Sequence, residues 1–121
     1  MQQLVRDFKQ RVEVLDLGSE GSDWISEMLV ALLGGAFRLA MLGAGAILDK
    51  LVKRNGKGER QWEGPDHQVK QWKAIYEWRN LLTHKDGVAI CCTVDEWRTI
   101  LENVYTFLRM HSPLPVNLPP Q

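Results

Sequence analysis

The chain has 121 residues, 45% of them hydrophobic, which is enough for one domain with a real core. Fifteen Lys and Arg residues balance fifteen Asp and Glu residues, so the formal net charge at neutral pH is zero. Because no net field draws in nucleic acid from a distance, this composition argues against a protein that coats nucleic acid. Any attraction to phosphate must come from a local patch of cations.

An amphipathic helix is expected at the start of the chain, across residues 2 to 17. Its apolar residues recur at helical spacing: Leu4, Phe8, Val12 and Leu15. The Gly-Ser-Glu-Gly sequence at 18 to 21 then interrupts the pattern. Ser22 with Asp23 is a suitable start for the next segment, because a short side-chain oxygen accepts hydrogen bonds from free backbone N–H groups.

Residues 28 to 48 form a long apolar stretch in which Arg38 is the sole charge. Its length and hydropathy fit a membrane span. Against a span, a central Arg costs about 2.5–3.5 kcal/mol on insertion scales, and the four glycines of the stretch weaken a helix. The sequence therefore favours a buried central helix, or two helices broken near Gly34 and Gly35, and no membrane partner is expected. Arg38 then needs a partner or a ligand, since a lone charge on an apolar helix is costly.

Basic residues crowd the region that follows: Lys50, Lys53, Arg54, Lys57 and Arg60. Asp49 and Glu59 oppose them, and residues 55 to 68 read as a loop because they contain three glycines and Pro65. One interpretation is a solvated helix end whose cations suit the negative end of the helix dipole. The other is a phosphate-binding patch, in which the predicted RNA-binding residues are Lys50, Lys53, Arg54 and Lys57.

A further helix is predicted from about Asp66 to Lys85, with Gly87 as its cap. Projected at about 100° per residue, one broad arc of this helix is apolar: Val69, Trp72, Ile75, Tyr76, Trp78 and Leu82. Arg79 falls inside that arc, where a helix built for packing alone would carry Leu or Ala. His84 falls on the polar side, beside Asn80.

The last helix is predicted to begin at Thr93, because Thr93 and Glu96 form a capping box, and to run to about Met110. Residues 88 to 92 before it are β-branched and predicted to be extended. Residues 112 to 121 are rich in proline and predicted to form an extended tail. The expected fold is all-α: an up-down bundle of four to five helices in a single domain, residues 1 to 111.

The cysteines and the N-terminus bear on location. Cys91 and Cys92 are adjacent, a spacing at which a disulfide is strained and which is not that of a zinc site. Reduced thiols favour a cytoplasmic or nuclear protein. The first residues lack the apolar run of a secretory signal, so export is not expected.

The sequence Arg-Asn-Leu-Leu-Thr-His at 79 to 84 carries the chemistry of the chain. Arg is always cationic and His titrates near neutral pH, so the pair can stabilise a phosphate charge and move a proton without metal. An Arg, a polar amide and a His near the end of a helix, followed by a turn and an amphipathic helix, resemble the HEPN superfamily. The resemblance covers about residues 23 to 110, and its specific part is Arg79, Asn80 and His84.

This resemblance implies an HEPN-like helical bundle and a metal-independent endoribonuclease that needs no cofactor. RNA-cleaving members of the superfamily pair so that two motifs face each other across a dimer interface. Carried over here, Arg79 and His84 would be the catalytic residues of a homodimer acting on single-stranded RNA, and Asn80 would hold the imidazole or the 2′-hydroxyl. The chain would be one domain of a larger defence or RNA-quality-control protein.

Other interpretations stay open. Arg79 would also be explained by an internal ion pair with Glu77, Asp86 or Glu102, and His84 by the helix dipole. Non-catalytic relatives of the superfamily serve as dimerisation or nucleotide-binding modules, so a helical module that binds a partner protein or a nucleotide is the alternative. A third possibility is a single-pass membrane protein.

Overall fold

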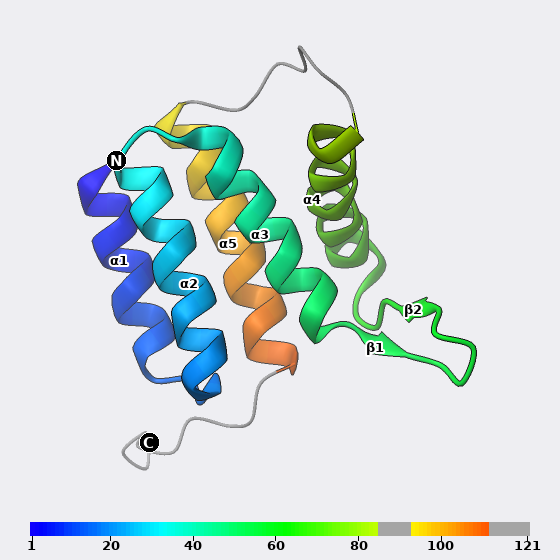
Figure 1. Ribbon diagram of the computed structural model, residues 1–121. Helices are drawn as coiled ribbons and strands as arrows, with labels where there is room; N and C mark the ends of the chain where they lie inside the picture. The colour runs from blue at the N-terminus through cyan, green and yellow to red at the C-terminus, as the bar shows by residue number, and fades with distance from the viewer. Residues whose placement is uncertain (85–92, 112–121) are drawn as a thin grey trace.

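The computed structural model describes residues 1–84 and 93–111. Within these ranges the chain forms five helices and one short antiparallel hairpin (Figure 1). The helices are α1 Gln2–Glu13, α2 Gly18–Leu33, α3 Phe37–Leu51, α4 Asp66–His84 and α5 Val94–His111. The hairpin pairs β1 Lys53–Arg54 with β2 Arg60–Gln61. The predicted all-α bundle is therefore confirmed, with a hairpin whose turn and second strand lie inside the segment predicted as a loop.

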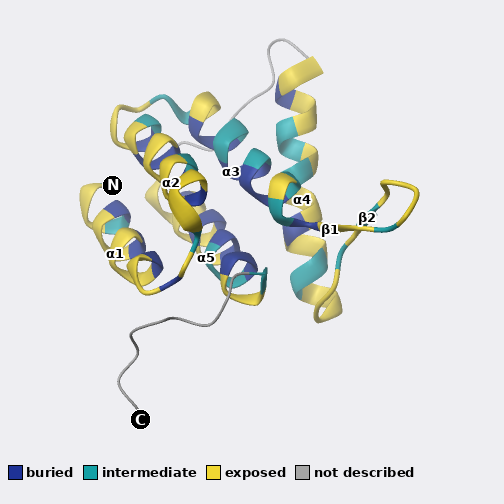
Figure 2. Cartoon of the chain, turned by 60° about the horizontal axis from the view of Figure 1, so that its bottom comes forward, coloured by how far each residue is buried: buried dark blue, intermediate teal, exposed yellow. Residues whose placement is uncertain are grey.

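Helix α3 lies in the middle of the bundle, with α2 packed on one side and α4 on the other (Figure 1). Helix α5 contacts α1, α3 and α4 and so joins the two sides. The buried faces of the helices turn toward the interior (Figure 2). The largest fully buried side chains come from α2 to α5 and include Trp72, Trp97, Phe107, Met28 and Met41.

The connection between α1 and α2 differs from the prediction. Helix α1 ends at Glu13, and α2 already begins at Gly18, so a start at Ser22 was wrong. Gly18 has a φ of +71°, a left-handed conformation that glycine adopts without strain. Gly21 lies inside the first turns of α2, where a Cβ atom would come within 2.8 Å of the Leu17 Cβ. The glycines that suggested an interruption instead permit the turn and the close packing at the start of α2.

The apolar stretch from 28 to 48 is divided between two helices, which agrees with the predicted break near Gly34 and Gly35. Gly35 has a φ of +76°, its N–H donates to the Leu32 carbonyl, and the Ala36 N–H donates to the Ala31 carbonyl. This pattern is a Schellman motif, which satisfies the last carbonyls of a helix and ends it. Across residues 1–84 and 93–111, no helix has both the length and the apolar character that crossing a bilayer requires.

The remaining glycines of this stretch let α3 approach its neighbours, as expected for small residues in a bundle. A Cβ atom at Gly43 would lie 3.3 Å from the Met28 Cβ on α2. At Gly45 it would lie 2.3 Å from the Arg79 Cβ on α4, closer than two carbon atoms tolerate. Gly45 therefore sets the distance between α3 and α4.

The two last helices begin where the sequence predicted. Helix α4 starts at Asp66, and α5 follows the capping box at Thr93. The Glu96 N–H donates to Thr93 Oγ1 at 3.2 Å, and the Thr93 N–H donates to Glu96 Oε1 at 3.3 Å. The predicted cap at Gly87, the extended segment 88 to 92 with its two cysteines, and the tail 112 to 121 lie outside the described residues.

Candidate functional site

The C-terminal half of α4 presents its motif residues in two directions. Arg79 faces α3: its side chain is 32% exposed, and its stem lies against Gly45. Asn80 and His84 are exposed and lie one turn apart on the outer face. Arg79 and His84 are separated by five residues, or about 140° around an ideal helix. Within one chain the structure therefore does not bring the guanidinium and the imidazole together.

Asn80 and His84 share an open hollow of about 370 Å³. Among the described residues this hollow is lined by α4 side chains alone: Glu77, Asn80, Leu81 and His84. Leu81, beside these polar residues, is 39% exposed. The hollow thus offers an amide, an imidazole and an apolar side chain to whatever approaches this face.

Arg79 reaches an acid that the sequence did not indicate. Its Nη1 atom lies 3.6 Å from Oδ2 of Asp49, in the last turn of α3. Asp49 lies one turn after Gly45, so the residue that admits the stem of Arg79 and the residue that meets its charge share one face of α3. This spacing of Gly45 and Asp49 was the signal available in the sequence.

The acids that were expected as partners of Arg79 have other positions. Glu102 on α5 forms an ion pair with Arg11 on α1, which raises the pKa of Arg11 above its ordinary value through the hydrogen bond and the charge of Glu102. Glu77 lines the outer hollow of α4. Asp86 lies outside the described residues. The ion pair predicted for Arg79 thus exists, but with Asp49.

Two further arginines bind the same carboxylate. Asp49 Oδ1 accepts hydrogen bonds from Arg54 Nη2 at 2.9 Å and from Arg60 Nε. The hydrogen bond from Asp49 raises the pKa of Arg60 above its ordinary value, and the Arg60 guanidinium also lies 4.3 Å above the ring of Tyr76. We call Arg54, Arg60 and Arg79 the arginine cluster. It joins β1, β2 and α4 to the end of α3.

The four residues predicted to bind RNA have different contacts. Lys50 Nζ lies 4.1 Å above the ring of Trp24 on α2, and Lys53 forms an ion pair with Glu63 at 3.3 Å. Lys57 is exposed in the turn between β1 and β2. Of the predicted set, Arg54 alone belongs to the arginine cluster. Arg60 and Arg79 complete it instead.

Arg38, the charge inside the apolar stretch, has a backbone partner. It lies in the first turn of α3, and its Nη2 atom donates a hydrogen bond to the carbonyl of Leu82. Leu82 is in the last turn of α4, where carbonyl groups have no partner within the helix. A cation at this end also suits the helix dipole. Arg38 therefore caps the helix that carries the motif.

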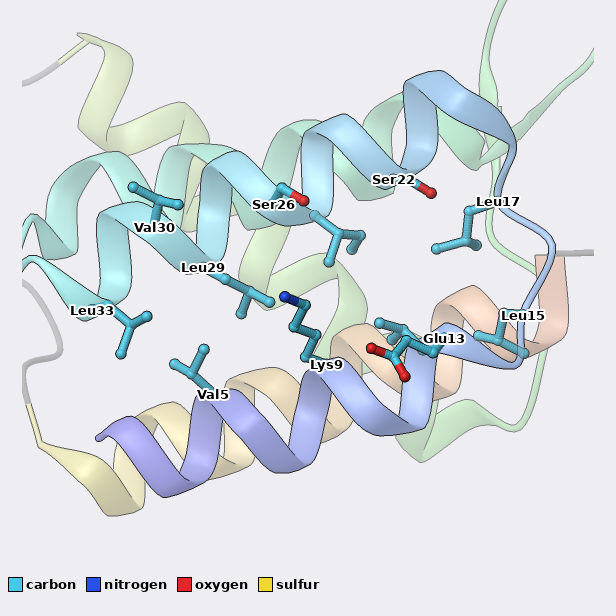
Figure 3. A pocket seen from close by; sticks show the side chains of 12 residues that line it. Val5, Lys9, Glu13, Leu15, Leu17, Ser22, Ser26, Leu29, Val30 and Leu33 are labelled. Atoms are coloured by element: carbon cyan, nitrogen blue, oxygen red, sulfur yellow. The ribbon is translucent and has the colours of Figure 1, made fainter.

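Helices α1 and α2 lie on the side of the bundle away from α4 (Figure 1), and a second concave surface lies between them (Figure 3). We call it the α1–α2 groove; it has a volume of about 380 Å³. Its walls are mainly apolar and include Val5, Leu15, Leu29, Val30 and Leu33, and the Lys9 side chain extends across it (Figure 3). Val30 is 69% exposed and Leu33 is 49% exposed. An apolar surface of this kind suits an apolar helix or a second protein.

Comparison with known proteins found no relative of this chain: no family model, no curated protein and no solved structure matches it. Function has to be argued from the site itself. The site offers a partly exposed guanidinium at Arg79, a group suited to binding phosphate, and an imidazole at His84, a group suited to proton transfer. These two groups lie near one end of α4, on different faces.

Proposed function

We propose that the protein is a metal-independent endoribonuclease of the HEPN type that cleaves single-stranded RNA. The observation that carries the proposal is the end of α4, where exposed Asn80 and His84 share a hollow on one face and a partly exposed Arg79 lies on another face. These are the residue types that RNA cleavage requires, in the order that resembles the HEPN motif. A cytoplasmic or nuclear location and a larger parent chain belong to the same proposal.

The proposed reaction needs no outside nucleophile. The RNA 2′-hydroxyl attacks the adjacent phosphorus, its proton passes to a neutral His84, and the 5′-oxygen leaves with a proton from the second copy of His84. The products are a 2′,3′-cyclic phosphate and a free 5′-hydroxyl. Positioned proton transfer of this kind contributes about 10²–10⁴-fold. Arg79 would stabilise the negative charge that grows on the phosphorane through parallel N–H donors.

The proposal requires two chains. Because Arg79 and His84 point about 140° apart on one helix, an Arg from one chain has to meet a His from the other. Two α4 helices related by a two-fold axis would provide this pairing. Exposed Leu81 lies beside Asn80 and His84 in the same hollow and provides apolar area for such a contact.

Arg79 is available for this role because Asp49 holds it weakly. The 3.6 Å separation is longer than a hydrogen bond, and Asp49 already accepts hydrogen bonds from Arg54 and Arg60. The partial exposure of Arg79 leaves its N–H donors accessible. A phosphate can therefore compete for this guanidinium without breaking a hydrogen bond made by residues 1–84 and 93–111.

One cleavage assay tests the proposal. Purified protein is incubated with single-stranded RNA and EDTA, together with Arg79→Ala, His84→Ala and the matched control His67→Ala, which alters an exposed histidine at the other end of α4. We expect both motif variants to lose about 10²-fold or more in rate, His67→Ala to keep the wild-type rate, and the products to carry 2′,3′-cyclic phosphates. Equal rates in all four proteins would mean a contaminating nuclease and would refute the proposal.

The dimer is tested separately by analytical ultracentrifugation. Leu81→Asp puts a charge beside the motif, whereas Leu33→Asp puts the same charge in the α1–α2 groove on the other side of the bundle. The proposed nuclease predicts that Leu81→Asp dissociates the dimer and abolishes cleavage, while Leu33→Asp does neither. A wild-type protein that stays monomeric at high concentration would contradict the composite site.

The second candidate is a non-catalytic helical module for dimerisation or for binding a protein partner or nucleotide. The α1–α2 groove favours it, because exposed Val30 and Leu33 adjoin a concave apolar surface. This candidate predicts the reverse result: Leu33→Asp dissociates the complex, Leu81→Asp does not, and the wild type leaves RNA intact.

A further inference from the structure

The arginine cluster has more positive charge than its single acid neutralises. Arg54, Arg60 and Arg79 converge on Asp49, and the ion pairs of the described residues give them no other carboxylate. Of the other acids of the hairpin, Glu63 pairs with Lys53, and Glu59 accepts a hydrogen bond from Asn55. Three guanidinium charges therefore face the one carboxylate of Asp49, at a surface where the three arginines are 31% to 41% exposed.

The three arginines are not equally committed to the fold. Arg54 also donates to the Gly58 carbonyl at 2.8 Å and so holds the turn of the hairpin. Arg60 uses Nε for Asp49, and the described residues provide no hydrogen bond for its two Nη atoms. No hydrogen bond within the described residues satisfies the guanidinium of Arg79 either. Arg60 and Arg79 thus offer several free N–H donors around one carboxylate.

These donors are held in place before any ligand binds. The ring of Tyr76 supports the Arg60 guanidinium, and Gly45 fixes the position of the Arg79 stem. Trp62, directly after β2, packs with its ring 6.0 Å from Tyr76 and 6.1 Å from Phe107, so the hairpin is anchored to α4 and α5. Rigid guanidinium groups lose little entropy when they bind a planar or tetrahedral anion.

We infer that Arg60 extends the phosphate site of Arg79 to a neighbouring backbone phosphate of single-stranded RNA, and that Asp49 is an internal anion with which the RNA competes. The inference rests on the proposed nuclease function, which it deepens by assigning a path to the RNA strand. The strand runs from the motif at the end of α4 along the arginine cluster toward the hairpin. Arg54 shapes the hairpin and does not bind the phosphate.

The decisive experiment removes the competing anion. Binding of a fluorescent, uncleavable 2′-O-methyl oligonucleotide is measured by anisotropy for the wild type, Asp49→Asn and the matched control Glu102→Gln. The control deletes the same charge from an ion pair on the α1–α5 side of the bundle. We expect Asp49→Asn to bind about 2- to 5-fold more tightly, because the arginines no longer share their charge with a carboxylate, and Glu102→Gln to bind like the wild type. A purely structural Asp49 predicts unchanged or weaker binding.

A second variant covers the case in which Asp49→Asn loosens the hairpin. Arg60→Gln should weaken binding by a similar factor for every sequence tested and reduce the salt slope of the affinity by about 0.7, the value for one phosphate contact on a single strand. Arg11→Gln, which removes an arginine from the other side of the bundle, should leave the slope unchanged. An unchanged slope in Arg60→Gln would overturn the inference.

The outcomes separate this inference from the proposed function. If His84→Ala abolishes cleavage but Asp49→Asn and Arg60→Gln leave binding as in the wild type, the arginine cluster is structural and the nuclease stands. If the wild type never cleaves RNA but both cluster variants change binding as expected, the phosphate site is supported and the nuclease is wrong.

Discussion

The helix pair α3 and α4 and the helix pair α1 and α2, on opposite sides of the bundle, pack differently. Helices α3 and α4 approach each other so closely that a Cβ atom at Gly45 would overlap Arg79. Helices α1 and α2 leave a groove of about 380 Å³ between apolar side chains. The close interface contains a glycine and the stem of a charged residue, whereas the open one contains large aliphatic residues. Apolar character alone therefore does not decide where this molecule is well packed.

The difference also separates the chemistry of the two sides. Because α4 lies against Gly45, the guanidinium of Arg79 reaches Asp49 at the end of α3, together with the arginines of the hairpin. The α1–α2 groove is crossed by Lys9 but holds no comparable cluster of charges among its described residues. Charged recognition is thus expected at α4 and apolar recognition at α1 and α2.

The largest expected effect on the free energy of unfolding comes from a comparison of one residue on the α4 side of the bundle with one in the α1–α2 groove. Trp72 on α4 is completely buried, and its Nε1 donates to the Asn103 carbonyl on α5 at 3.0 Å. We expect Trp72→Ala to lower the free energy of unfolding by about 3–5 kcal/mol in urea titrations, because it leaves a large cavity and removes a buried hydrogen bond. Val30→Ala in the groove should change it by less than about 0.5 kcal/mol. A loss above about 1 kcal/mol for Val30→Ala would show that the groove is covered in solution.

A pair of glycines tests the close interface itself. Gly45→Ala should destabilise the protein by about 1–3 kcal/mol, since the new methyl group would meet Arg79 Cβ and force α4 away from α3. Gly43→Ala places its methyl group 3.3 Å from Met28 Cβ, where a small shift and the better helix propensity of Ala offset each other. Thermal melts of both variants measure the difference. Equal stability of the two would mean that Gly45 does not set the α3–α4 distance.

The smallest expected effect concerns the cap of α4. Arg38→Met keeps most of the aliphatic stem but removes the hydrogen bond to the Leu82 carbonyl. Because Arg38 is exposed, we expect a loss of about 0.5–1 kcal/mol, with faster amide exchange in the last turn of α4. Leu39→Ala, at an exposed neighbour on α3, provides the control and should leave the exchange of α4 unchanged.

Local signals predicted the elements where short-range physics dominates. Thr93 and Glu96 satisfy each other within one turn, and Gly35 ends α2 with hydrogen bonds to the preceding turn, so both boundaries are readable from a few residues. The helix start predicted at Ser22 was wrong because the glycines at 18 to 21 allow two structures, a break or a closely packed helical turn. Contact with Leu17 decides between them.

The amino-acid sequence by itself determined which residues could take part in catalysis or binding. Helical periodicity, a property of local backbone geometry, predicted the position of Arg79 inside an apolar arc. It also predicted that Asn80 and His84 lie one turn apart on the polar face and that the capped helix α5 follows. The tertiary structure alone decided that Arg79 meets Asp49 and that Arg60 and Arg54 join them. Arg79 is distant from Asp49 in sequence and reaches it only because α4 approaches Gly45, whereas the hairpin after α3 folds back and brings Arg54 and Arg60 to the same carboxylate.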